Sequence, residues 1–283
     1  MKNSKLHYLI RLFIALLFVG ASFLIYAVLK MLLRSLDMYD LIPVRVFSTI
    51  AMILLVYYGY ALYLRFFENR KPLEYSKNGW LKELSLGLLL GSGLIIIQVV
   101  ILKIINVYHI NQIAFTTSVV NILLISVITG FLEELLNKGI IFRLLEEGLG
   151  SIIGAIIVSL EVGITHITNT GATAFSTIAV SLQFGLMLTF IYMITRRLWL
   201  VTGFHFAWNF TMGGIFGINV SGLDTDGIIS SSLEGHDLIT GGDFGIEATI
   251  QAVVICLIIT IALAYYIIKN KIYNKPIWLK REK

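Results

Sequence analysis

The chain has 283 residues, of which 57% are hydrophobic and only 14% are charged, and its mean hydropathy is +0.86. This composition excludes an ordinary soluble domain and indicates an all-α, polytopic membrane protein. The formal net charge of +5 does not indicate a nucleic-acid partner, because the basic residues flank apolar segments, where they favour lipid headgroups of the bilayer. A single cysteine, Cys256, excludes an intrachain disulfide and a cysteine-type metal cluster.

Eight apolar segments follow one another along the chain, and each approaches the roughly 20 residues that a helix needs to cross a bilayer. We expect a bundle of about eight transmembrane helices at residues 9–33, 44–66, 84–105, 116–145, 151–167, 172–195, 198–218 and 248–268. The first segment follows basic residues as a signal peptide would, but its length predicts a retained span. Residues 1–283 are expected to form a single integral membrane domain.

The charges between these segments predict the orientation of the chain. Basic residues precede the first segment and follow the second, fourth, sixth and eighth, and those near the termini include Lys2, Lys5, Lys280, Arg281 and Lys283. Residues 219–247 instead carry six acidic residues and no Lys or Arg. Both termini are therefore expected in the cytoplasm. We expect residues 219–247 to form a flexible, solvated extracytoplasmic loop; a gate or a partner surface is the alternative.

Two adjacent carboxylates, Glu133 and Glu134, lie inside the fourth apolar segment. A carboxylate near the middle of a bilayer costs at least ~2.5 kcal/mol on insertion scales, so such a residue indicates function. Glu134 and Lys138 are four residues apart on one helical face, which predicts an ion pair that neutralises Glu134. Glu133 is rotated by about 100° from that face and is expected to project toward another helix.

Further polar residues lie in the fifth and seventh segments. His205 and Asn209 are four residues apart and share one face of their helix. Each of the four side chains of Glu133, His166, His205 and Asn209 would be unfavourable against lipid, and one hydrated pocket would satisfy all of them. For Glu161, structural pairing with another helix and an accessory role near the site both stay open.

Three short motifs carry a resemblance to a known family. EELLNKG at residues 133–139 resembles the EExxxR motif of the CPBP intramembrane endopeptidases, which include the type II CAAX prenyl endopeptidases and the bacterial Abi or bacteriocin-processing proteins. VGITH, which ends at His166, is similar to their FxxxH motif, and HFAWN at residues 205–209 matches their HxxxN/D motif. The motifs occur in the family's order, and residues 116–218 are expected to form the catalytic-type core.

Two positions depart from the family's pattern. Lys138 stands where the family has Arg, and Val162 stands where it has Phe. Because Lys does not form the planar, two-pronged bond of a guanidinium, we expect a looser ion pair with Glu134.

The resemblance implies an intramembrane endopeptidase of a bacterial cell membrane. Its substrate would be a prenylated, leader or membrane-associated peptide, or a membrane protein. Glu133 would activate water as general base and His166 would help to hold that water, while His205 and Asn209 would stabilise the oxyanion. Glu134 and Lys138 would support the site, and no cofactor is implied. The oligomeric state and the substrate's identity have no readable signature.

Other functions stay open at this point. In a zinc-dependent version of the protease, Glu133, His166 and His205 would be the ligands and water the fourth, although the chain has no HExxH segment. A non-catalytic peptide-binding or bacteriocin immunity protein belongs to another class, as does a proton-relaying transporter. A transporter would more often show inverted repeats and helices interrupted at mid-depth, which the sequence does not show.

Overall fold

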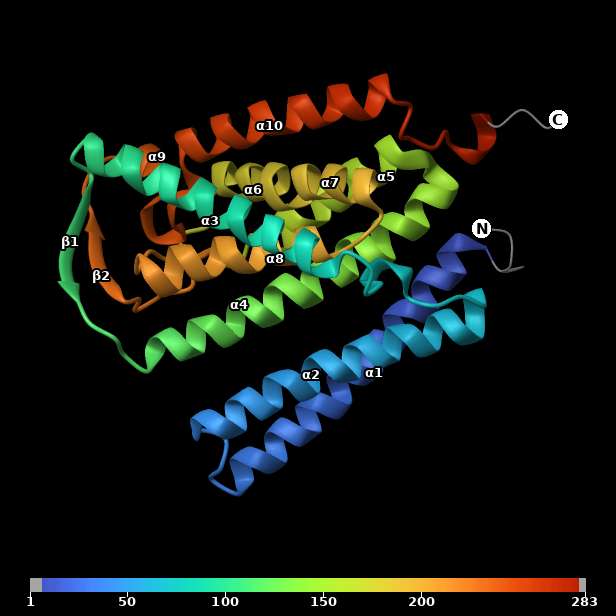
Figure 1. Ribbon diagram of the computed structural model, residues 1–283, viewed down its shortest axis with the longest axis horizontal. Helices are drawn as coiled ribbons and strands as arrows, with labels where there is room; N and C mark the ends of the chain where they lie inside the picture. The colour runs from blue at the N-terminus through green and yellow to red at the C-terminus, as the bar shows by residue number, and fades with distance from the viewer. Residues whose placement is uncertain (1–6, 280–283) are drawn as a thin grey trace.

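In the computed structural model, which describes residues 7–279, the chain is mostly helical (Figure 1). The expected class, an all-α membrane protein, is confirmed. Lys2, Lys5, Lys280, Arg281 and Lys283, which contribute to the predicted orientation, lie outside the described residues. Helix α1 begins and helix α10 ends at the same end of the molecule (Figure 1), as an even number of crossings requires.

The elements follow the apolar segments closely. The α-helices are α1 (Tyr8–Ser35), α2 (Ile42–Tyr63), α3 (Trp80–Ile104), α4 (Ser118–Glu134), α5 (Arg143–Thr165), α6 (Ala174–Val180), α7 (Leu188–Thr195), α8 (Trp199–Asn209), α9 (Asp237–Thr240) and α10 (Ile250–Lys269). Wider π-helical segments extend several of them: η1 (Leu64–Glu68), η3 (Leu135–Phe142), η4 (Ser181–Met187) and η5 (Phe210–Ile215). Short 3₁₀ turns are η2 (Leu73–Tyr75), η6 (Gly242–Phe244), η7 (Ile246–Ala248) and η8 (Ile277–Leu279).

Six helices of the described chain are long and apolar enough to cross a membrane. All eight predicted segments are helical, but the fourth and fifth lie in one 48-residue helix, Ser118–Thr165, and α8 with η5 is shorter than the others. The boundary predicted between residues 145 and 151 is a bend at Gly150, whose φ is 80°. A Cβ there would also lie 2.7 Å from the backbone nitrogen of Pro276, so only glycine fits.

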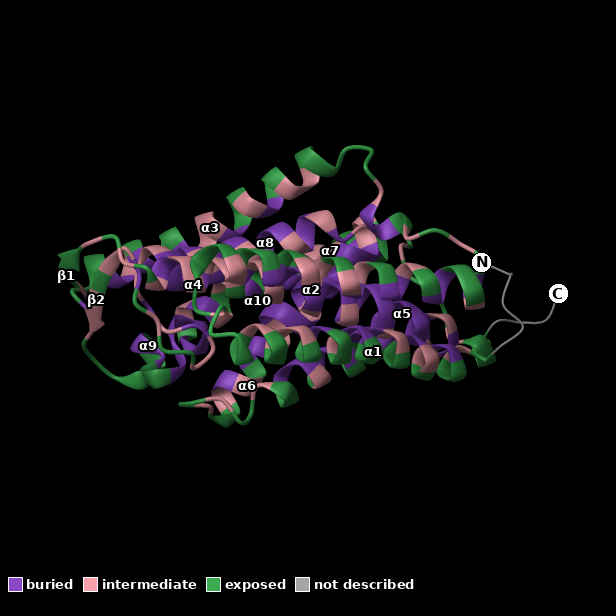
Figure 2. Cartoon of the chain, turned by 90° about the horizontal axis from the view of Figure 1, so that it is seen from below, coloured by how far each residue is buried: buried purple, intermediate pink, exposed green. Residues whose placement is uncertain are grey.

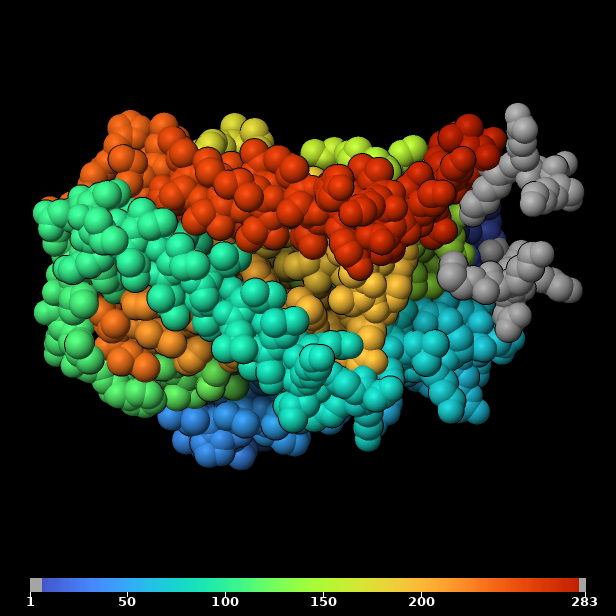
Figure 3. All heavy atoms as spheres, turned by 45° about the horizontal axis from the view of Figure 1, so that its top comes forward, coloured from blue at the N-terminus to red at the C-terminus, as the bar shows by residue number. Residues whose placement is uncertain are grey.

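Helix α8 lies in the middle of the bundle, between α3 and α4. Gly87 and Gly91 let α3 approach closely, because a Cβ on either residue would lie 2.2 or 2.3 Å from a backbone oxygen of α8. Gly130 does the same for α4, where a Cβ would lie 2.9 Å from the backbone nitrogen of Phe206. Figure 2 shows that buried residues gather in this central region and that exposed residues line the outer helices. Helix α10 covers one side of the bundle (Figure 3).

Helices α1 and α2 form a hairpin at the edge of the bundle (Figure 1). Its attachment to the start of α5 is ionic: the two terminal nitrogens of Arg143 each donate to a carboxylate oxygen of Glu68 at 2.9 Å, and Arg11 pairs with Glu147. Such a two-pronged bond fixes orientation as well as distance. The hairpin is therefore held at the end of the molecule where α1 begins.

Residues 219–247, expected to form a flexible, solvated loop, are folded, and we call them the cap. Strand β2 (Ile229–Leu233) pairs antiparallel with β1 (Tyr108–Ile113), from the Tyr108–Leu233 pair to the Ile113–Ile229 pair. The all-α expectation did not include this two-stranded sheet. Phe244, Ile246 and Glu247 at the end of the cap are completely buried. Because the cap is rich in Gly, Ser and Asp, its sequence did not indicate that these three residues are buried.

Candidate active site

Glu134 joins helix α4 to helix α8. Its side chain is completely buried and lies 3.1 Å from the Nζ atom of Lys138, so the ion pair predicted from the spacing is present. Its Oε1 atom also lies 3.0 Å from Nδ1 of His205, a contact that the sequence did not predict. Because a carboxylate only accepts hydrogen bonds, Nδ1 carries the hydrogen in this contact, and Nε2 is the nitrogen left for a ligand.

Lys138 is the residue that replaces the family's arginine, and its side chain is also completely buried. Besides Glu134, its Nζ atom donates to the backbone oxygen of Phe184 at 2.7 Å. The ring of Phe184 in turn lies 4.5 Å from the imidazole of His205, measured between centroids. The ammonium of Lys138 therefore connects Glu134 to η4. Phe184 is a neighbour of the site that sequence reasoning missed.

Asn209 also contacts α4, one helical turn away from Glu133. Its Nδ2 atom donates to Oγ1 of Thr129 at 3.0 Å. Thr129 precedes Glu133 by four residues, so the two share a face of α4. The Thr129–Asn209 and Glu134–His205 contacts together align α4 and α8 in opposite directions. Thr129 was not among the predicted residues, although its spacing from Glu133 was a usable signal.

Glu133 is half-buried, and its carboxylate is held by no hydrogen bond or ion pair within residues 7–279. His166 ends α5, and its Nδ1 atom lies 2.7 Å from the backbone oxygen of Val162. Since a carbonyl oxygen only accepts, Nδ1 carries the hydrogen, and Nε2 is an acceptor without a hydrogen-bond partner among residues 7–279. Val162, the other departure from the family's pattern, contributes its backbone to this contact.

Glu161 lies close enough to Glu133, Lys138 and His166 for their charges to act on it. Its Oε2 atom is buried without a hydrogen-bond partner in the part of the chain that the structure describes. Within residues 7–279, no Lys, Arg or His side chain lies at hydrogen-bond distance from Glu161, so the structure shows no ion pair for it.

Within the described chain, hydrogen bonds thus link only two of the four predicted catalytic residues to a neighbouring helix of the site. His205 and Asn209 both bond to α4 on either side of Glu133, whereas no hydrogen bond within the described range joins Glu133 or His166 to the other two. The zinc alternative required Glu133, His166 and His205 to converge on one ion. No group of three His, Cys, Asp or Glu side chains in residues 7–279 has an arrangement that could hold a metal.

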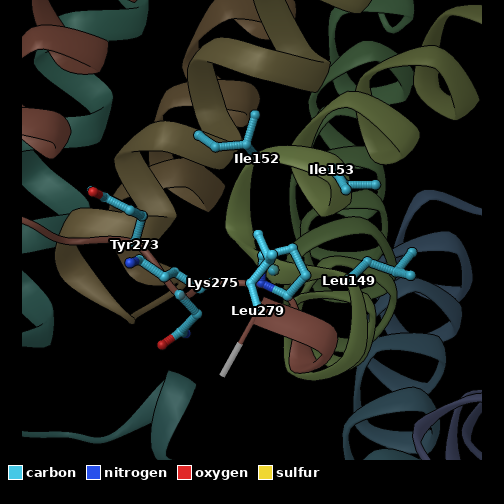
Figure 4. Close-up of a pocket in the computed structure, with 9 residues that line it drawn as sticks. Leu149, Ile152, Ile153, Tyr273, Lys275 and Leu279 are labelled. Carbon is cyan, nitrogen blue, oxygen red and sulfur yellow. The ribbon is translucent and has the colours of Figure 1, made fainter. Parts of the chain in front are cut away.

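Two cavities lie at opposite ends of the described chain. One of about 350 Å³ lies between the bend of α5 and the C-terminal segment and is lined by Leu149, Tyr273 and Pro276, among others (Figure 4). Another of about 290 Å³ lies in the cap beside β2 and is lined by polar residues that include Asn219 and Asp237. Neither cavity is lined by a predicted site residue.

Residues 115–211 match the family model of the type II CAAX prenyl endopeptidase Rce1-like proteins. This segment, about a third of the chain, is similar to the CAAX intramembrane protease family. It contains all three motifs, so the resemblance stated from them is confirmed. No curated protein and no solved structure matches the chain.

Glu247 lies outside the segment that matches the CAAX protease family, yet it adjoins the site. It is completely buried, and its Oε1 atom accepts a hydrogen bond from Nε1 of Trp208 at 3.0 Å. Burial raises the pKa of Glu247, while hydrogen bonds from Ser221 and Trp208 and the charges of His166 and His205 act to lower that pKa. Sequence reasoning missed this residue because it is one of six acids in a segment interpreted as solvated.

Proposed function

We propose that this protein is an intramembrane endopeptidase in which Glu133 activates water for attack on a peptide carbonyl. The match to the CAAX protease family supports proteolysis within a membrane. The observation that carries the mechanism is the placement of two hydrogen-bonding side chains of α8 against α4. His205 reaches Glu134 at 3.0 Å and Asn209 reaches Thr129 at 3.0 Å, so both lie beside the turn that bears Glu133.

In this proposal Glu133 takes a proton from the attacking water and later passes it to the nitrogen of the leaving amine. The carboxylate of Glu133 has no protein partner within the described chain, which suits a group that binds water. Nε2 of His166 is the acceptor nitrogen of the ring, because Nδ1 donates to Val162, and it would accept the second hydrogen of the same water. Glu133 and His166 therefore act on the nucleophile.

His205 and Asn209 act on the carbonyl oxygen. An amide nitrogen has two hydrogens, so Asn209 keeps one for the oxyanion after donating the other to Thr129. His205 would donate from Nε2 in its doubly protonated form, while its Nδ1 atom stays bonded to the buried carboxylate of Glu134 at 3.0 Å. Each such donor contributes roughly 3 kcal/mol to stabilising the transition state.

The proposed substrate is a prenylated, leader or membrane-associated peptide, which would reach the site among apolar helices. No cofactor takes part in these steps. We further propose a bacterial cell membrane with both termini in the cytoplasm. The start of α1 and the end of α10 lie at one end of the molecule (Figure 1), which supports a location on the same side of the membrane.

A cleavage assay tests the proposal. The purified protein in liposomes is incubated with a farnesylated CAAX peptide and with a bacteriocin leader peptide, and products are identified by mass spectrometry. We expect Glu133→Gln to lower kcat by about 100-fold or more, whereas Glu234→Gln, whose side chain is 77% exposed in the cap, keeps wild-type activity. Activity is expected to survive chelation by EDTA. Full activity of Glu133→Gln, or activity that returns only with added zinc, would overturn the mechanism.

A further inference from the structure

The buried carboxylate of Glu247 joins the two ends of the cap. Oε2 of Glu247 accepts hydrogen bonds from the backbone nitrogen of Ser221 at 2.8 Å and from its hydroxyl at 2.6 Å. Ser221 and Glu247 lie near the first and last positions of the cap, so this contact ties its two ends together. The backbone nitrogen of Gly222 donates to the oxygen of Phe244 at 2.8 Å and reinforces the same closure.

The same residue is bonded to two elements of the membrane core, to one through its side chain and to the other through its backbone. Its Oε1 atom accepts from Trp208 of α8 at 3.0 Å, and its backbone oxygen accepts from Nε2 of Gln183 in η4 at 2.9 Å. A fully buried acid is a costly way to fasten a loop, because an apolar residue of similar volume often stabilises a fold as well or better. The position therefore calls for a role beyond holding the cap in place.

An aromatic chain connects Glu247 to the oxyanion side of the site. Trp208 packs edge-on against Phe184, with centroids 5.6 Å apart, and Phe184 packs against the imidazole of His205 at 4.5 Å. Trp208 lies between His205 and Asn209 in the sequence of α8, and Phe184 follows Gln183. Glu247 thus bonds Trp208, which packs on Phe184, and Gln183, which precedes Phe184 in the chain. Phe184 is the ring that packs against His205, and we call Trp208 and Phe184 the aromatic wall of His205.

We propose that Glu247 is a positioning residue, which holds Trp208 and Phe184 against His205 and makes the geometry of the oxyanion side depend on the closure of the cap. This inference rests on the proposed function of the site. Glu247 contacts no reacting atom in it. A small displacement of His205 relative to Glu134 is enough to lower the rate, because misplacement by about 1 Å can cost 100-fold.

The test uses the full-length protein in liposomes, with Glu247→Gln and Glu247→Ala compared with Glu234→Gln as the matched acid of the same cap. Only folded, monodisperse protein is assayed. We expect Glu247→Ala to lower kcat by about 10- to 100-fold and Glu247→Gln by less, since Gln still accepts one bond. KM is expected to change by less than about twofold, because substrate binding is not removed. Wild-type kcat in folded Glu247→Gln and Glu247→Ala would overturn the proposal.

A double variant separates positioning from general damage. Trp208→Phe keeps an aromatic ring but loses the N–H that bonds Glu247, so the double variant Glu247→Gln/Trp208→Phe should lose no more activity than the more impaired single variant. Losses that multiply would show that Glu247 does not act through Trp208. Should wild type cleave while Glu133→Gln does not, the proposed function stands, and these variants then decide the inference alone.

A second readout is independent of cleavage. Diethyl pyrocarbonate modification of His205 is followed by mass spectrometry, with the exposed His7 as the internal reference. We expect His205 of Glu247→Ala to react about threefold faster than in wild type or Glu234→Gln, since its wall opens more often. Equal rates in all three proteins would contradict the proposal even if no substrate had been found.

Discussion

Glu134 Oε1 and His205 Nδ1, 71 positions apart in the chain, lie 3.0 Å from each other in the buried centre of the molecule. This contact makes the second glutamate of the motif, rather than the first, the structural link between α4 and α8. The first glutamate is left without a protein partner in the described range. The spacing of Glu134 and Lys138 predicted that Glu134 is paired and that Glu133 is not, and the side-chain contacts agree.

Removal of Glu134 is expected to destabilise the fold strongly. In Glu134→Ala the ammonium of Lys138 stays buried without its carboxylate, which costs about 3–5 kcal/mol. Glu83→Ala is the control, because its ion pair with Arg197 is partly exposed and is worth less than about 1 kcal/mol. Unfolding midpoints in detergent would measure both. Equal midpoints for the two variants would show that the Glu134–Lys138 pair does not carry this energy.

Asn209 and Thr129 should differ in their effects on the reaction. Asn209→Ala removes a proposed oxyanion donor and is expected to lower kcat by about 10²- to 10³-fold. Thr129→Val removes the acceptor that orients Asn209 but keeps the proposed donor itself, so its kcat should fall less. Stability should fall by about 1–3 kcal/mol because a buried N–H loses its partner. Steady-state kinetics on folded protein would check the order, and an unaffected Asn209→Ala would contradict it.

Two neighbouring glycines of α3 offer a matched test of helix packing. A Cβ at Gly91 would lie 2.3 Å from the backbone oxygen of Phe204, whereas a Cβ at Gly93 would meet nothing within 4 Å. Gly91→Ala should therefore destabilise the protein by about 1–3 kcal/mol. Gly93→Ala should stabilise it by up to about 1 kcal/mol through helix propensity. Thermal unfolding would reveal both, and identical shifts would exclude close α3–α8 packing.

Stability should depend on pH through Glu247. Burial raises the pKa of this carboxyl above its ordinary value of 4.5, so the folded protein holds the proton more tightly than the unfolded chain does. Its contribution is fully present below about pH 4.5 and is lost as pH rises through the folded pKa, at up to about 1.4 kcal/mol per unit. The unfolding free energy of wild type minus that of Glu247→Gln should therefore decrease as pH rises. A difference that grows with pH would show that the hydrogen bonds from Ser221 and Trp208 outweigh burial.

Much of the membrane part could be predicted because its signals are local. Apolar length placed the helices, and spacings of four residues placed Lys138 beside Glu134 and Asn209 on the face of His205. What joins one helix to another has no local signal. The contact between Glu134 and His205, the carbonyl of Phe184 that accepts from Lys138, and the β1–β2 pairing depend on tertiary packing between segments far apart in the chain.

The cap shows why composition misled. Its Gly, Ser and Asp residues are typical of a solvated loop, and composition averages over the few positions that are buried. Phe244 and Ile246 enter the core, and Glu247 is satisfied by donors from Trp208 and from Ser221. An acid whose partners lie 26 and 39 positions away has no signature within its own segment.

The π-helical segments have a consequence for changes in chain length. Segment η3 starts directly after Glu134, η4 contains Phe184, and η5 starts directly after Asn209. Each wide turn accommodates a surplus residue, so loss of one residue there would restore the ordinary helical repeat with little change in the direction of the residues beyond it. Loss of one residue from an ordinary helical turn would instead rotate everything beyond it by about 100°. Deletion of a single codon within η5 should therefore be tolerated better than deletion of one within α8, which would face Gly217 and the start of the cap in a new direction.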